Sequence, residues 1–263
     1  MLIASMWGYS LAAFFAFSFA ASAIYCLNDI RDVEADKIHQ KKRLRPIASG
    51  AVKVSSAYIL MAISAILSLL TALLLPWGIP SLASIIALYL VLNVAYCFKL
   101  KHVAIIDVFT VSIGFVLRIL AGGIACGIWV SPWLACMTFI LALFLAFAKR
   151  RDDVIIREQT GVVVRKNILG YNSSFLNQTL GILAAVMMMC YIIYAVSPAV
   201  TARFNCEYLY VTSVFVLAGI LRYLQVAMVE TRSGSPTKVL LHDRFLQIDL
   251  LCWIITFITI IYL

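Results

Sequence analysis

The sequence predicts an all-α protein that crosses a membrane several times, as a polytopic bundle of transmembrane helices. Of its 263 residues, 64% are hydrophobic and only 13% are charged, and the mean hydropathy is +1.01. The apolar residues form runs close to the roughly 20 residues that one spanning helix requires, and the charges gather between those runs. This composition excludes an ordinary soluble domain and gives no sign of a nucleic-acid partner.

Eight segments are apolar enough to be spans. They cover approximately residues 2–27, 51–75, 81–98, 103–126, 132–148, 174–197, 207–229 and 244–262. The segment 81–98 is short, so we expect it to be tilted or shallow in the bilayer. No soluble domain or low-complexity linker separates the spans, so we predict one membrane domain over residues 1–263.

The positions of the cations predict how the protein is oriented. They concentrate in the links after the first, third, fifth and seventh spans, and the other links hold only Arg203. By the positive-inside rule, the cation-rich links are cytoplasmic and both ends of this chain lie outside, in an inner or plasma membrane. Topology and anionic lipids explain part of the net charge of +9; the remainder suggests a polyanionic substrate.

The cysteines and histidines give little support to a metal or redox site. The seven cysteines are scattered without a CxxC pair, and most fall inside spans, where they act as small apolar residues. The three histidines, His39, His102 and His242, fall in separate links.

The segment from Asn28 to Gly50 carries the strongest sign of chemistry. Its four acidic residues directly follow an almost uncharged apolar run, where carboxylates are costly unless they bind something. On a helix, Asn28, Asp32 and Asp36 form one stripe and Asp29 borders it. Such a stripe repels itself, and hard oxygen ligands suggest Mg²⁺ shared with substrate phosphates. The alternative is helix capping, with the acids paired to nearby Lys and Arg.

Cationic and polar residues beyond this stripe complete the candidate substrate site. Arg43 and Arg45 can grip phosphate oxygens bidentately, and Lys42 can act as a mobile point charge. Arg118 lies deep in a span, so we expect it to face a water-filled cavity. For the link cations the alternative is a solvated loop, and for the turn at residues 234–244 structural capping and substrate contact are equally open. The further candidates are Tyr96, Lys99, Asp107, Lys149, Arg150 and Asp153.

At these residues the chain resembles the UbiA superfamily of intramembrane prenyltransferases. NDIRDVEAD, residues 28–36, matches the superfamily's first NDxxDxxxD motif, and the downstream RPIASG, residues 45–50, adds to the fit. Within the superfamily, the closer likeness is to decaprenyl-phosphate phosphoribosyltransferases. That likeness is carried by YCFKLKHVAIIDVFTVSIGFVLRILAGG, FAKRRDD, RKNILGYN, and RYL followed by GSPTKVLLHDRFLQ.

Two features depart from the superfamily pattern. The second DxxxD-type motif is incomplete, because Asp152 is followed four residues later by Ile156, and this favours a site that uses cations instead. The superfamily usually has nine spans, so the eight counted here suggest that the first family helix is absent from this chain.

The resemblance implies a Mg²⁺-dependent transfer of 5-phosphoribose from 5-phosphoribosyl 1-diphosphate to a polyprenyl phosphate of the decaprenyl type, with release of diphosphate. It implies that Asp29, Asp32 and Asp36 are catalytic and hold the metal, and that Asn28 contacts the substrate. A cytoplasmic cap is expected to cover a central cavity, with the isoprenoid tail between spans; the oligomeric state is left open.

Two alternatives remain at this point. A prenyltransferase that moves an isoprenyl chain from its diphosphate to an aromatic or other small acceptor uses the same first motif. A non-catalytic transporter or lipid-binding membrane protein would tolerate the loss of Asp29 or Asp32.

Overall fold

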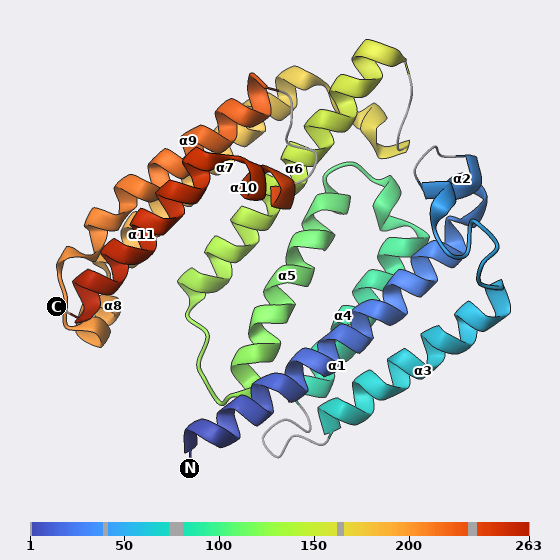
Figure 1. Ribbon diagram of the computed structural model, residues 1–263, viewed down its shortest axis with the longest axis horizontal. Helices are drawn as coiled ribbons and strands as arrows, with labels where there is room; N and C mark the ends of the chain where they lie inside the picture. Colours follow the sequence, from blue (N-terminus) through green and yellow to red (C-terminus); the bar gives the residue numbers. More distant parts are fainter. Residues whose placement is uncertain (1, 39–41, 74–80, 162–165, 231–235, 263) are drawn as a thin grey trace. The chain divides into compact units, whose positions relative to one another are not determined.

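The computed structural model describes residues 2–38, 42–73, 81–161, 166–230 and 236–262. Helices are the only regular secondary structure in these ranges, which confirms the predicted all-α class (Figure 1). The chain forms two compact units, Met1–Ser131 and Pro132–Leu263. The single membrane domain expected from the sequence stays a prediction.

Each of the eight predicted spans contains a helix among its described residues. Among the described residues, seven helices are long and apolar enough to cross a membrane. The eighth, predicted to be short, is the apolar helix Leu82–Phe98. Many large apolar side chains on these helices are exposed, as lipid-facing surfaces require.

The first unit is built around its N-terminal helix. Its elements are α1 (Leu2–Arg31), α2 (Val33–Ile38), η1 (Lys42–Leu44), α3 (Val54–Leu73), α4 (Ser81–Phe98), η2 (Leu100–His102) and α5 (Ile106–Ala125). Figure 1 shows α1 running alongside α3 and α4, with α2 near the end where α3 begins.

Small side chains allow α1 and α3 to pack closely. Ala16 and Ala20 of α1 are fully buried, and so are Ser68 and Ala72 of α3. The Ser68 hydroxyl donates a 2.7 Å hydrogen bond to the carbonyl oxygen of Ala16. Small residues and interhelical hydrogen bonds are the usual means of joining helices in a membrane, because lipid offers no hydrophobic driving force between them.

The second unit contains the remaining helices. They are α6 (Pro132–Thr160), η3 (Lys166–Gly170), α7 (Ser173–Val196), α8 (Pro198–Phe204), η4 (Tyr208–Thr212), α9 (Ser213–Met228), α10 (Pro236–His242) and α11 (Arg244–Tyr262). Within this unit, α6 packs against α7, and α9 packs against both α7 and α11. Asn172 caps α7 by accepting a 2.7 Å hydrogen bond from the backbone N–H of Phe175.

Two helices run further than the apolar pattern predicted. The first span was expected to end at residue 27, but α1 continues to Arg31 and carries Asn28 and Asp29. The fifth was expected to end at residue 148, but α6 continues to Thr160. Hydropathy marks where a segment ceases to be apolar, and a helix can continue past that point into polar residues.

Candidate active site

The predicted acidic stripe lies across the junction of α1 and α2. The backbone N–H of Asp32 bonds to the Asn28 carbonyl at 2.9 Å, and that of Asp36 bonds to the Asp32 carbonyl at 2.8 Å. These bonds keep the three residues in helical register although the helix is interrupted at Asp32. Asp36 is 2% exposed, whereas Asn28, Asp29 and Asp32 are partly buried.

Arg45 joins two of the acidic residues. One of its guanidinium nitrogens, Nη1, lies 2.8 Å from Asp29 Oδ1 and 2.8 Å from Asp36 Oδ2. Lys42 adds a longer contact, with Nζ 3.9 Å from Asp36 Oδ1. Arg45 and Lys42, which are predicted to bind phosphate, are thus paired with the acids here, as in the alternative considered for the stripe.

A series of turns brings Arg45 back to the stripe. The Arg45 N–H bonds to the Lys42 carbonyl at 2.9 Å, and the Val52 N–H bonds to the Pro46 carbonyl at 3.0 Å. Gly50 has a φ of +81°, a left-handed conformation that favours glycine. RPIASG thus folds as a tight connection into α3, with Arg45 at its start.

Lys101 joins the other two polar residues of the stripe, and sequence reasoning missed it. Its Nζ lies 2.5 Å from Asp32 Oδ1 and 3.4 Å from Asn28 Oδ1. Lys99 is the lysine that the sequence predicts here. The helix α4 ends at Phe98 and a single turn of η2 follows, so the local turn geometry decides which lysine faces the acids. Lys99 is exposed.

The other predicted residues of this region have different surroundings. Arg43 is exposed and makes no ion pair within the described part of the chain. Tyr96 is partly buried and packs against the apolar core of the first unit. Asp107 is fully buried in the first turn of α5. Lys41, next to Lys42, lies outside the described residues.

Arg118 lies among aromatic side chains. Its guanidinium carbon is 4.8 Å from the ring centre of Phe115, 5.6 Å from that of Phe17 and 5.7 Å from that of Tyr89. It also donates a 3.3 Å hydrogen bond to the Tyr89 hydroxyl. Cation–π contacts of this kind stabilise an arginine within a span. The water-filled cavity expected beside Arg118 stays a prediction, and the structure adds three aromatic rings around its guanidinium group.

In the second unit, α6 carries a run of charged residues at its polar end. Arg150 is 4% exposed, and its Nη1 lies 3.7 Å from Asp153 Oδ2, while Lys149 is exposed. Arg151, which the sequence analysis did not select, donates to Asn177 Oδ1 at 2.6 Å and to the carbonyls of Ala227 and Met228. Arg151 thereby ties the ends of α7 and α9 to α6.

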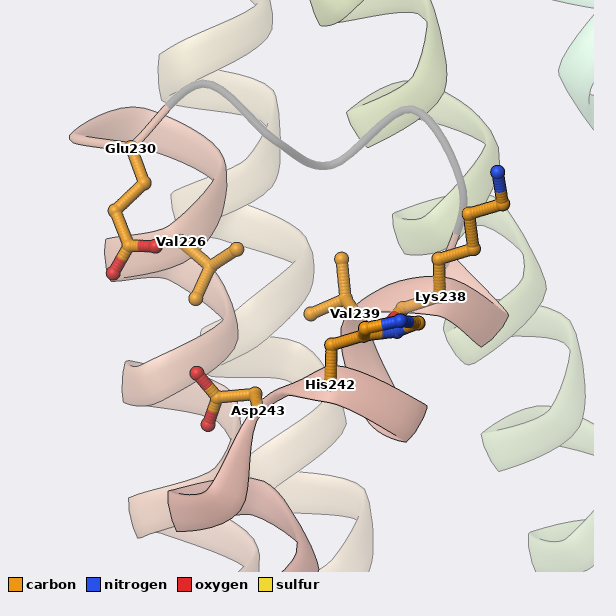
Figure 2. Close-up of a pocket in the computed structure, with 6 residues that line it drawn as sticks. All are labelled: Val226, Glu230, Lys238, Val239, His242 and Asp243. Atoms are coloured by element: carbon orange, nitrogen blue, oxygen red, sulfur yellow. The ribbon is translucent and has the colours of Figure 1, made fainter.

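A pocket of about 320 Å³ with both charged and apolar lining residues lies between the end of α9 and α10, next to the start of α11 (Figure 2). Arg222 bridges its two acids, with Nη2 2.6 Å from Asp243 Oδ2 and 3.0 Å from Glu230 Oε1. The hydrogen bond from Arg222 holds the pKa of the Asp243 carboxyl below its usual range. Asp243 also accepts from the Leu246 N–H at 2.9 Å and so caps α11, as the capping alternative predicted. Gly234 and Ser235 lie outside the described residues.

An apolar cavity of about 680 Å³ lies among α6, α7, α9, α10 and α11. Phe144, Met187 and Leu250 are among its lining residues. Asp249 also lines it, and a Cβ added at Gly219 would come within 2.9 Å of Asp249 Oδ2, so this carboxylate lies directly against α9. The cavity has the apolar character that a lipid chain requires.

Comparison with known proteins identifies the family. The model of the UbiA prenyltransferase family matches residues 3–261. The chain belongs to the UbiA prenyltransferase family. It is accordingly a membrane-embedded enzyme of the transferase class, which confirms the resemblance and the enzyme class predicted from NDIRDVEAD and the segments after it.

Relatives of known name cover nearly the whole chain. The decaprenyl-phosphate phosphoribosyltransferase of Mycolicibacterium smegmatis is 38% identical over 257 residues, which cover 95% of this chain and 79% of that protein. The Corynebacterium glutamicum protein of the same name is 36% identical, over 95% of this chain and 75% of that protein. A solved UbiA homologue from Archaeoglobus fulgidus, bound to DMAPP and Mg²⁺, has a TM-score of 0.69 and 18% identity, covering 97% of this chain and 88% of that one.

The oxygen atoms of this UbiA protein's stripe suit Mg²⁺ in type. Carboxylate and amide oxygens are the ligands that Mg²⁺ prefers. Within the described residues, however, no group of three or more His, Cys, Asp or Glu side chains is arranged to hold a metal ion. The stripe is instead divided into two pairs of oxygens, each converging on one cationic nitrogen. These oxygens are therefore suited to bind a cation, and in this structure the cations that they contact are Lys101 and Arg45.

Proposed function

We propose that this UbiA protein transfers 5-phosphoribose from 5-phosphoribosyl 1-diphosphate to a polyprenyl phosphate and releases diphosphate. The observation that carries the proposal is 36–38% identity over at least 93% of the chain to relatives named decaprenyl-phosphate phosphoribosyltransferase. The cations that accompany the acidic stripe support a reaction in which both substrates bear phosphate.

Asp29, Asp32 and Asp36 would hold Mg²⁺, and Asn28 would contribute a neutral oxygen. The bound ion supplies positive charge that offsets the charge developing on the departing diphosphate. This proposal for the metal agrees with the Mg²⁺ found in the A. fulgidus homologue, although likeness at 18% identity extends to the fold alone.

The chain's own cations would bind and orient the phosphates. Arg43 is exposed, makes no ion pair within the described part of the chain, and is accessible to an incoming phosphate. Arg45, Lys42 and Lys101 lie directly at the acidic stripe. Cations fixed in place before the reaction stabilise developing negative charge without the cost of reorganising solvent.

The transfer itself needs no strong general base. The bond between the sugar C1 and the diphosphate oxygen breaks, the electron pair leaves with diphosphate, and an anionic oxygen of the lipid phosphate forms the new bond to C1. Because that oxygen is already deprotonated, the residues need only bind the two groups and exclude water from the oxocarbenium-like carbon. We retain Tyr96, Lys99, Arg118, Lys149, Arg150 and Asp153 as proposed substrate contacts.

We also propose where the reaction takes place. The positive-inside rule puts the acidic stripe at the cytoplasmic face of the membrane, where a water-soluble sugar phosphate is accessible. The lipid tail would lie between spans, and the apolar cavity of the second unit has suitable walls for part of it.

A donor comparison tests the proposal. Purified protein in lipid nanodiscs is incubated with labelled 5-phosphoribosyl 1-diphosphate and decaprenyl phosphate, and in parallel with labelled prenyl diphosphate and an aromatic acceptor. The proposal predicts a labelled lipid product in the first mixture. A product in the second mixture alone would establish the prenyltransferase alternative, which the family's description favours. The matched control is Asp32→Asn, in which product formation should fall at least about 100-fold in either mixture.

A further inference from the structure

Two protein cations lie where the oxygens of the acidic stripe converge. The Lys101 ammonium is shared by Asp32 and Asn28, at 2.5 and 3.4 Å. One nitrogen of Arg45 is shared by Asp29 and Asp36, at 2.8 Å from each. Both cations come from outside the stripe, one from η2 and the other from the connection that precedes α3.

Without these cations the stripe would be unstable. Its three carboxylates lie within two turns of helix beside an apolar span, where like charges repel strongly and solvent screens them poorly. Asp36, with a side chain 3% exposed, has little contact with water. A positive charge between the acids is therefore needed to keep the stripe in its folded arrangement before any ligand arrives.

The same oxygens cannot serve a protein cation and a metal ion at once. Mg²⁺ binds its oxygen ligands at about 2.0–2.1 Å in a tight octahedral shell. An ammonium 2.5 Å from Asp32 Oδ1 occupies the space that such an ion would take. Lys101 is well placed to leave, because its charge is at the end of a flexible four-carbon stem and its three N–H donors can turn toward a new partner.

We propose that Lys101 and Arg45 act as internal counter-cations that exchange partners during substrate binding. In the ligand-free protein they neutralise the stripe. When a divalent metal arrives with a diphosphate group, the carboxylates bind the metal and the two protein cations bind the phosphate oxygens. The inference rests on the proposed function for the identity of the ligand class, a metal-bound diphosphate.

The exchange makes metal and diphosphate binding cooperative. Metal alone must displace Lys101 and Arg45 and leave them without anionic partners, so it binds weakly. Diphosphate supplies those partners, so metal binds more tightly in its presence, and by linkage the effect is reciprocal. Lys101 and Arg45 are thus positioning residues for the metal as well as ligands for the phosphate.

Metal binding without turnover tests the exchange. The probe is Mn²⁺, followed by electron paramagnetic resonance on the full chain in nanodiscs, with and without inorganic diphosphate. In Lys101→Met, Mn²⁺ alone should bind more tightly than in the unaltered protein by a factor on the order of ten, and the gain in affinity caused by diphosphate should shrink by a similar factor, within the usual range of coupling between sites. Lys53→Met is the matched control, because Lys53 is an exposed lysine that immediately precedes α3 and carries the same charge.

Each outcome decides the matter. If Lys101→Met binds Mn²⁺ no more tightly than Lys53→Met does, Lys101 does not compete with the metal and the proposal is wrong. Lys101→Arg, which keeps the charge, guards against misfolding: it should bind Mn²⁺ as weakly as the unaltered protein, and tight binding by this variant would also overturn the exchange. Diphosphate is common to phosphoribosyl and prenyl donors. If the expected Mn²⁺ binding is observed but no phosphoribosyl transfer occurs, the proposed function is wrong and the exchange of partners still holds.

Discussion

Asp32 and Asp36 belong to one stripe, yet their replacement by asparagine should have different consequences. The Asp36 side chain is 3% exposed and pairs with Arg45 at 2.8 Å. Breaking a fully buried ion pair costs about 3–5 kcal/mol. Arg45 is 34% exposed and keeps Asp29 as a partner, so we expect Asp36→Asn to lower the free energy of unfolding by about 1–3 kcal/mol.

Asp32→Asn should leave the fold nearly intact. The Asp32 side chain is 28% exposed, and its partner Lys101, 13% exposed, keeps Asn28 Oδ1 as a second acceptor, so the loss should not exceed about 1 kcal/mol. Both variants remove a proposed metal ligand, however. We therefore expect each to lose at least about 100-fold in transfer activity, since even residues that only orient metal ligands contribute 10–100-fold.

Thermal unfolding and activity measured on the same nanodisc samples distinguish the two effects. A loss of 1 kcal/mol lowers the melting temperature by roughly 2–4 °C for chains of this size. Glu34→Gln is the control, because this substitution removes the same negative charge as the two Asp→Asn changes but from an exposed pair with Lys37. These expectations are wrong if Asp36→Asn has the same melting temperature as Glu34→Gln, or if Asp32→Asn keeps more than about a tenth of the transfer activity.

Three further predictions follow from other parts of the structure. EDTA should abolish transfer and added Mg²⁺ should restore it; activity that survives complete metal removal would contradict the metal assignment. Arg151→Met should lower the free energy of unfolding by about 2–4 kcal/mol, because it leaves Asn177 and two carbonyls at the end of α9 without their donor; Lys53→Met, at an exposed lysine, is the control in the same melting experiment. The depressed pKa of Asp243 means that its ionised form is stabilised by folding. Its contribution is complete above the ordinary aspartate pKa and is lost as pH falls through the lower folded value, so Asp243→Asn should be less stable than the unaltered protein at pH 7 and should lose less stability on acidification below about pH 4.

Residues 28–36 show how much of the site local sequence can predict. The spacing of Asn28, Asp32 and Asp36 follows the helical repeat, and the repeat persists through the interruption at Asp32 because the backbone hydrogen bonds continue. Arg45 is also predicted from the sequence, as a phosphate ligand, and the structure pairs it with Asp29 and Asp36. Both conclusions depend on contacts between residues fewer than 20 positions apart.

Longer-range pairing escaped the sequence analysis. Lys101 is 69 residues from Asp32, and a single turn after α4 decides that Lys101 rather than Lys99 faces the acids. The aromatic surroundings of Arg118 depend on side chains from α1, α4 and α5 that meet only when the helices pack. Arg151 resembled any other cation at the end of a span, because its partners are at residues 177, 227 and 228.

The sequence by itself determined the membrane class, the helical spans and the family, because apolar length, charge distribution and a motif with helical spacing are all properties of the linear chain. The tertiary structure alone decided which cation meets which acid, since a lysine or arginine side chain reaches its partner only after a turn has set its direction and neighbouring helices have brought the two segments together.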